Sequence, residues 1–121
     1  MVEVVVTDEF KDWYEALDAR HQDGVRRVVN LLMHRGVALG EPFSSAIRGS
    51  RAALRELRVQ VKGHPIRVLY AFDPERQAVL LLGGDKTGRP RFYDELVPRA
   101  ERLWEEYLRT RGRERPTEGR D

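Results

Sequence analysis

Three strand-like segments joined by two short turns do most to restrict how this chain can fold. The segments are residues 54–59, 66–74 and 80–88. Residues 62–65 separate the first two and residues 73–76 the last two, and both connections contain the Gly, Pro or Asp residues that tight turns favour. Because strands joined by such short turns pair antiparallel, the sequence predicts a three-stranded meander.

Positive charge is concentrated on this meander. Residues 47–91 hold ten basic and four acidic side chains, a net +6, although the whole chain carries only +2. The flanking residues 1–46 and 92–121 carry −3 and −1. A localised basic patch is typical of a surface that binds nucleic acid. A charged fraction of 35% also fits an ordinary solvated surface, so the charge alone leaves both readings open.

The segments on either side of the meander predict helices. Residues 2–6 are rich in valine and indicate a short first strand. Thr7 or Asp8 can cap a first helix, Asp18 marks the boundary before a second, and Gly36 is suited to end it. The first helix has apolar residues at helical spacing, namely Phe10, Trp13, Tyr14 and Leu17; the second has Val25, Val28, Val29, Leu32 and Met33.

The remaining segments complete a single α+β domain. We expect residues 37–53 to be an irregular connection and residues 93–110 to be a last helix with one apolar face. Residues 112–121 contain no apolar side chain, which predicts a disordered tail after a domain spanning residues 1–111. The expected fold is therefore an N-terminal helical pair and a C-terminal helix packed on a small antiparallel sheet.

Cysteine content and hydropathy set further limits. The chain has no cysteine, which excludes disulfides and thiolate metal sites and makes a reducing cytoplasm the default compartment. No apolar run approaches the roughly 20 residues of a membrane helix, and the N-terminus lacks a signal-peptide pattern. We therefore expect a cytoplasmic protein without a membrane partner. Nothing in the sequence calls for a cofactor, and no His, Asp and Glu cluster has metal-ligand spacing.

Four segments taken together resemble the HigB/RelE superfamily of bacterial toxins, in its branch of phage Gp49-like proteins. They are LRELRV, IRVLYAFDP, LLLGGDKTG and FYDELVPRAERLWEEYL, the last at residues 92–108. The resemblance spans about residues 4–108. It implies a compact RelE-like fold, ribosome-dependent cleavage of mRNA, inhibition of translation, and neutralisation by a cognate antitoxin. That antitoxin would be a small helix-turn-helix protein of HigA type, through which alone the toxin would meet DNA.

The resemblance also assigns catalytic residues. Arg58 matches the arginine of the family's ELR strand, Arg67 that of its IRV strand, and Lys86 the lysine of its K-T end. The chemistry is compatible, because an arginine fork can bind two phosphate oxygens and a 2′-hydroxyl can attack the phosphate without a metal. Arg55, Lys62, Arg89 and Arg91 complete the expected RNA-binding set.

The acid/base group is where this chain departs from the family pattern. Many members carry a histidine or tyrosine after the last strand, whereas residues 85–91 contain neither. His64 and Lys62 in the first turn then remain for proton transfer, and His64 is our fourth catalytic candidate. Tyr93 lies just beyond, at the expected start of the last helix.

Several alternatives stay open at the level of sequence. Arg55 and Arg58 point to opposite faces of a regular strand, so one of them would be structural. Arg67 could instead form a buried ion pair with Glu56. A ParE-like toxin that binds a protein target such as gyrase, or an RNA- or ribosome-binding module without cleavage, would also fit. We expect the antitoxin to contact the helical pair at least in part.

Overall fold

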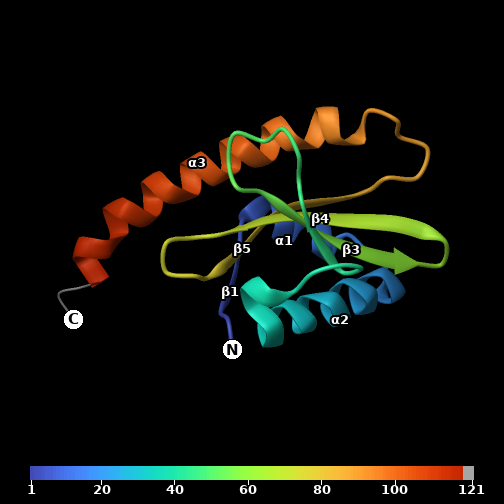
Figure 1. Cartoon of the computed structure of the whole chain (residues 1–121), viewed down its shortest axis with the longest axis horizontal. Coiled ribbons are helices and arrows are strands. Elements are labelled where there is room, and N and C mark those ends of the chain that lie inside the picture. The colour runs from blue at the N-terminus through green and yellow to red at the C-terminus, as the bar shows by residue number, and fades with distance from the viewer. Residues whose placement is uncertain (119–121) are drawn as a thin grey trace.

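A five-stranded mixed sheet forms the centre of the molecule (Figure 1). The computed structural model describes residues 1–118, with side chains through residue 111. The strands are β1 (Val4–Val6), β2 (Ser44–Ala46), β3 (Arg55–Val61), β4 (His64–Phe72) and β5 (Ala78–Asp85). Their order across the sheet is β1-β5-β4-β3-β2. β1 runs parallel to β5 and every other neighbouring pair is antiparallel.

The predicted meander is present as β3, β4 and β5, but its first turn is shorter than expected. Lys62 and Gly63 both have positive φ, 50° and 81°, as the tight two-residue hairpin turn requires. His64 and Pro65 are therefore not turn residues; they begin β4 opposite Val61 and Gln60. The irregular connection predicted for residues 37–53 also contains β2, which pairs with the start of β3.

Two helices cover one face of the sheet, and one long helix crosses the other (Figure 1). Helices α1 (Asp8–Glu15) and α2 (Ala19–Arg35) begin at the predicted caps, because the side chains of Thr7 and Asp18 accept hydrogen bonds from the first turns. Gly36 ends α2 at φ 58° and opens the short η1 (Gly36–Ala38). The long helix is α3 (Phe92–Glu118).

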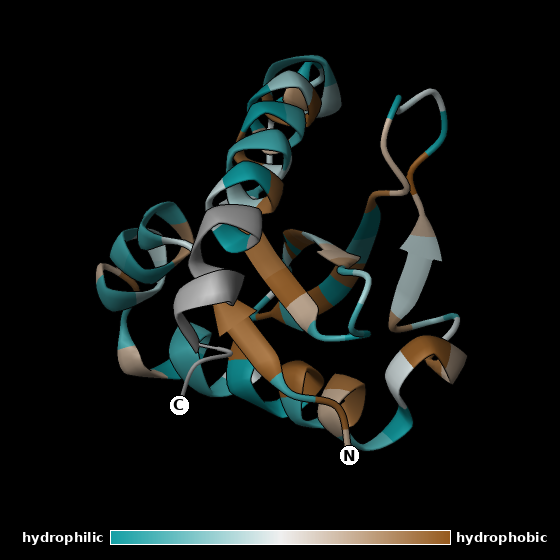
Figure 2. Ribbon diagram, turned by 90° about the vertical axis from the view of Figure 1, so that its left-hand side faces the viewer, coloured by the Kyte–Doolittle hydropathy of each residue, from teal (hydrophilic) through white to brown (hydrophobic). Residues whose placement is uncertain are grey.

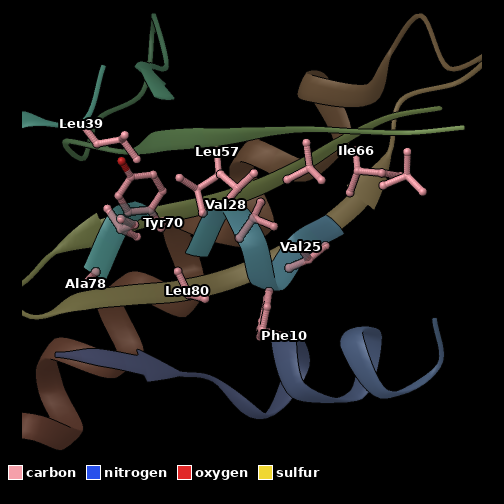
Figure 3. Close-up of a cluster of buried hydrophobic side chains, with 13 residues drawn as sticks. Phe10, Val25, Val28, Leu39, Leu57, Ile66, Tyr70, Ala78 and Leu80 are labelled. Carbon is pink, nitrogen blue, oxygen red and sulfur yellow. The ribbon is translucent and has the colours of Figure 1, made fainter. Parts of the chain in front are cut away.

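Each face of the sheet has its own hydrophobic core. On the α1–α2 face, Leu57, Ile66 and Tyr70 pack with residues of both helices, as the close-up of this cluster shows (Figure 3). On the α3 face, Leu69, Leu81 and Phe92 belong to a second cluster. Apolar strands therefore lie between largely hydrophilic helices (Figure 2), and alternate residues of each strand project to different layers.

Helix α3 is longer than the sequence predicts, because it continues past Thr110 to Glu118. It thus enters the segment for which we expected a disordered tail; residues 119–121 of that tail lie outside the described residues. Polar contacts hold the far part of the helix on the sheet. The Tyr107 hydroxyl donates to Asp73 at 2.9 Å, and Arg111 lies 3.5 Å from the same carboxylate. These contacts fix α3 beyond its apolar stripe.

Candidate functional site

A buried glutamate, Glu56, organises the charged residues on the α3 face of the sheet. Glu56 and Arg58 on β3 and Arg67 on β4 project to this face, and Arg58 and Arg67 are direct cross-strand partners. The Glu56 side chain is 5% exposed. Its two oxygens lie 3.2 Å from Arg58 Nε and 3.6 Å from Arg67 Nε. Both arginines predicted to bind phosphate therefore contact one carboxylate.

The start of α3 adds a tyrosine to this cluster. The Tyr93 hydroxyl donates a hydrogen bond to Glu56 at 2.6 Å. Burial raises the pKa of Tyr93 above its ordinary value, and the neighbouring Glu56 carboxylate raises it further. The phenol thus remains protonated and can serve as a donor at neutral pH. Lys86, just beyond β5, places its ammonium 5.1 Å from the centre of the Tyr93 ring, within the range of a cation–π contact.

Close packing behind these residues holds α3 against the end of β5. A side chain at Gly84 would approach the Phe92 ring to 2.9 Å and Leu96 to 3.2 Å. Only a glycine lets the first turn of α3 approach the strand so closely. Because Gly84 has no side chain, the first turn of α3 can pack against β5, and this packing places Tyr93 over the sheet.

An open groove of about 1140 Å³ runs over this cluster. Glu56, Arg58, Lys86 and Tyr93 line it, together with the β2–β3 connection and one side of α3. Arg58 also borders a smaller depression of about 490 Å³, to which Arg67 contributes. Arg58 therefore borders both hollows, and it lines the larger groove together with Arg48 and Arg51.

The charge of the cluster suits an anion. Arg58 and Arg67 pair with the Glu56 carboxylate and Lys86 lies over the Tyr93 ring, so the cluster holds three cations and one carboxylate. The Arg58 side chain is 39% exposed, whereas that of Arg67 is 14% exposed. Arg67 Nε is buried and finds no hydrogen-bond partner among the described residues. Arg58 and Lys86 are thus available to a phosphate, whereas the mostly buried Arg67 is paired with Glu56.

The structure does not bring His64 to this groove. His64 precedes Ile66 and Val68 on the α1–α2 face, and its ring lies 5.8 Å from that of His21 on α2. Its Nδ1 is 3.0 Å from Asp85 Oδ2. Our prediction of His64 as a proton-transfer residue beside Arg58 is therefore not supported by its position, because strand alternation puts the two on opposite faces.

The predicted RNA-binding residues lie in three different places. Arg55 faces the α1–α2 layer and donates to Ser44 Oγ and the Tyr70 hydroxyl, so it has the structural role that strand alternation allowed. Lys62 is exposed in the β3–β4 turn. Arg89 and Arg91 are exposed before α3 and pair with Glu95 and Asp94, at 2.7 and 3.7 Å. None of these residues lines the larger groove.

Sequence reasoning missed the importance of Glu56 and Tyr93. The sequence suggests Glu56 only as a partner of Arg67, and Tyr93 only as a residue near the helix start. One signal in the sequence could have found Glu56: it lies two residues before Arg58, and residues two apart in a strand project to the same face.

The described residues contain no group of three or more His, Asp or Glu side chains arranged to hold a metal ion. No helix among them is long and apolar enough to cross a membrane.

Comparison with known sequences identifies the family. Residues 12–105 match the family described as phage-derived Gp49-like proteins. Two Mycobacterium tuberculosis proteins whose names designate them as toxins, HigB2 and HigB3, are each 38% identical to this chain, over 99 and 107 residues. The matches cover 79% and 87% of this chain, but 49% of HigB2 and 92% of HigB3. The chain thus spans about half the length of HigB2.

Solved structures with the same fold are RelE toxins. The isolated Escherichia coli RelE toxin matches with a TM-score of 0.57 at 13% identity, over 82% of this chain and 98% of RelE. The RelE–RelB complex of Pyrococcus horikoshii gives 0.53 at 16% identity, over 73% of this chain and 97% of the matched chain. The chain therefore has a RelE-like α+β fold. It belongs to the Gp49-like family, within the HigB/RelE superfamily of toxins.

Proposed function

We propose that this protein is the toxin of a type II toxin–antitoxin pair and acts as a ribosome-dependent mRNA endonuclease. The observation that carries the proposal is the meeting of Arg58 and Lys86 with the Tyr93–Glu56 hydrogen bond in one open groove. Such a groove offers a phosphodiester both positive charge and a route for protons. The family membership, and the names of the relatives, support the same conclusion.

The reaction would use the substrate's own 2′-hydroxyl as nucleophile. The bond from this oxygen to phosphorus forms as the bond from phosphorus to the 5′-oxygen breaks, leaving a 2′,3′-cyclic phosphate and a 5′-hydroxyl. Arg58 stabilises the charge that develops on the phosphate oxygens. Arg67, which is mostly buried, holds the Glu56 carboxylate in position. No metal or other cofactor takes part in this proposed route.

Proton transfer would run through the hydrogen bond between Tyr93 and Glu56. Because Glu56 is buried, the substrate meets the Tyr93 hydroxyl first. That hydroxyl takes the proton of the 2′-hydroxyl as it passes its own proton to Glu56. The Lys86 ammonium, which lies over the Tyr93 ring, supplies a proton to the departing 5′-oxygen. The proton count is thereby balanced without His64.

The proposed partner is a cognate antitoxin of the HigA-like helix-turn-helix type, and contact with DNA would occur only through it. Two of the solved structures of this fold are complexes of a RelE toxin with RelB. An apolar depression of about 300 Å³ between β1, α1 and α2 offers a docking surface away from the charged groove. Phe10, Tyr14 and Val29 line it, with Lys11 and Arg26 beside them. Glu15 lines it too and Arg26 is paired with Asp23, so apolar contact is what this surface mainly offers a partner.

The catalytic proposal is tested by expressing the protein in bacteria without an antitoxin. Growth should stop, and primer extension should map transcript ends that disappear when translation of that transcript is blocked. Lys86→Ala, which leaves the pairs of Glu56 intact, should relieve arrest, because one lost transition-state donor costs about 10²–10³-fold in rate. Arg58→Ala should do the same. Arg35→Ala, which removes an exposed arginine of α2, is the matched control.

The outcomes separate the competing functions. Arrest without new transcript ends would overturn cleavage and favour a ParE-like toxin with a protein target such as gyrase. Transcript cuts of equal strength in wild type and Lys86→Ala, at matched protein levels, would remove Lys86 from the mechanism. RNA or ribosome binding with neither arrest nor cuts would favour a binding module.

The docking surface is tested by hydrogen exchange with and without the proposed cognate antitoxin. We expect protection within residues 8–35, on α1 and α2. Protection confined to residues 54–91 would mean that the antitoxin covers the groove directly and would contradict docking on the helical pair.

A further inference from the structure

The first two residues of β4 form hydrogen bonds with the segment that carries Lys86. His64 Nδ1 lies 3.0 Å from Asp85 Oδ2 and 3.2 Å from Thr87 Oγ1. The Pro65 carbonyl accepts the backbone N–H of Lys86 at 2.9 Å. Two consecutive residues of β4 thus contact three consecutive residues at the end of β5, namely Asp85, Lys86 and Thr87.

Chemistry fixes the direction of the His64 hydrogen bond. A carboxylate oxygen can only accept, so Nδ1 carries the proton and donates it to Asp85. Asp85 in turn accepts the backbone N–H of Thr87 at 2.8 Å. Burial alone would raise the pKa of Asp85, but the hydrogen bonds from Thr87, and the charge and hydrogen bond of His64, lower it below its ordinary value. Asp85 therefore stays ionised and keeps both contacts at neutral pH.

These contacts lie on the α1–α2 side of the sheet, whereas the Lys86 ammonium lies over Tyr93 in the groove. His21 packs behind the His64 ring and is itself paired with Asp18 at 2.8 Å. Residues 85–87 are thus held by contacts on the α1–α2 face, while the Lys86 side chain reaches the α3 face. Lys86 is followed by a turn in which its carbonyl accepts the backbone N–H of Arg89 at 3.0 Å and Gly88 has φ 66°. The side-chain contacts of His64 with Asp85 and Thr87 are what tie the two neighbours of Lys86 to β4.

We propose that His64 is a positioning residue that sets the place of Lys86 through Asp85 and Thr87. The inference rests on the proposed function, because it takes Lys86 to be the group that meets the substrate. It replaces the direct catalytic role that the sequence suggested for this histidine.

The position of Lys86 can be measured without any activity. The chain has three lysines, and Lys11 and Lys62 are exposed, so its lysine methylene spectrum is simple and contains two internal references. The Tyr93 ring should shift the Lys86 signal upfield, and Lys86→Arg should remove that signal and so assign it. In His64→Ala we expect at least half of the upfield shift to be lost. His64→Asn, which keeps a side-chain N–H donor, should restore most of it.

Controls separate positioning from general damage. His34→Ala, at an exposed histidine near the end of α2, should leave the Lys86 signal unchanged. If His64→Ala does not fold, Thr87→Val serves instead. Thr87 is exposed, and the change removes one acceptor of the clamp, by which we mean the contacts of His64 with Asp85 and Thr87. An unchanged Lys86 signal in a folded His64→Ala or Thr87→Val variant would overturn the proposal.

A second measurement connects the clamp with RNA cleavage. His64→Ala should lower kcat by about 10- to 100-fold with little change in KM, as expected for misplacement of one reacting group. The double variant with Lys86→Ala should be no slower than Lys86→Ala alone, because both changes remove the same contribution. Additive losses would overturn action through Lys86. If the wild type cuts no RNA at all, the proposed function fails, while the spectroscopic result still decides whether the clamp exists.

Discussion

Replacing Glu56 by glutamine tests how much of the groove depends on one buried charge. The change keeps the size of the side chain and an oxygen that can accept from Tyr93. It removes the negative charge next to Arg67, whose side chain is only 14% exposed. Breaking a buried ion pair by neutralising one partner costs about 3–5 kcal/mol, because the remaining charge stays buried without compensation. Arg58 is more exposed and adds less, since water replaces its partner.

Urea denaturation followed by tryptophan fluorescence would measure the effect. A loss of about 3 kcal/mol, with a slope of about 1.5–2 kcal/mol per molar, lowers the midpoint by about 1.5–2 M. Glu101→Gln is the matched control, since Glu101 is 8% exposed but its partner Arg51 is 74% exposed. We expect the control to shift the midpoint by less than half as much. Equal midpoints for wild type and Glu56→Gln would refute the dependence of Arg67 on Glu56.

Two further predictions concern packing and pH. Gly83→Ala should destabilise the fold by about 1–3 kcal/mol, because the new carbon would lie 2.5–2.7 Å from the Trp13 ring. Gly40→Ala, which has open space around it, should be tolerated and serves as the control. Thermal melts of the two variants measure the difference. Burial alone would raise the pKa of Asp73, but hydrogen bonds from Gln77, Tyr107 and Glu75 outweigh it and lower that pKa. The stability that the Asp73 carboxylate contributes is therefore complete above the unfolded pKa of about 3.9 and disappears as the pH falls through the lower folded value. Denaturant midpoints of Asp73→Asn and wild type should differ at pH 7 and converge in acid; a constant difference would contradict this assignment.

The elements that local patterns define could be predicted from the sequence. Thr7, Asp18 and Gly36 bound the first two helices because capping and left-handed backbone depend on the residue itself. The meander follows from short turns and alternating apolar residues. β2 gave no such signal, since Ser44–Ala46 is short and polar and becomes a strand only through pairing with β3. Tertiary context decides such edge strands.

The site was predicted in part for the same reason. Arg58 and Arg67 face each other because both lie within regular strands of the predicted hairpin. Lys86 lines the same groove as Arg58, whereas Arg67 does not line it and pairs with Glu56. The sequence predicts His64 in the turn, but the turn is two residues shorter and His64 begins β4. Its side chain therefore points to the face that strand alternation sets. The contact between Tyr93 and Glu56 joins residues 37 positions apart, which no local pattern reports.

The parallel pairing of β1 with β5 also bears on the order in which the chain can fold. Thr7 Oγ1 bonds to the carbonyl of Leu81, across 74 positions of sequence. The meander of β3, β4 and β5 needs only contacts between near neighbours, so it can form early, whereas β1 must wait until β5 has been synthesised. The groove forms later still, because it needs Tyr93, which is synthesised after β5. During synthesis the charged groove therefore cannot form until the first turn of α3 has been made.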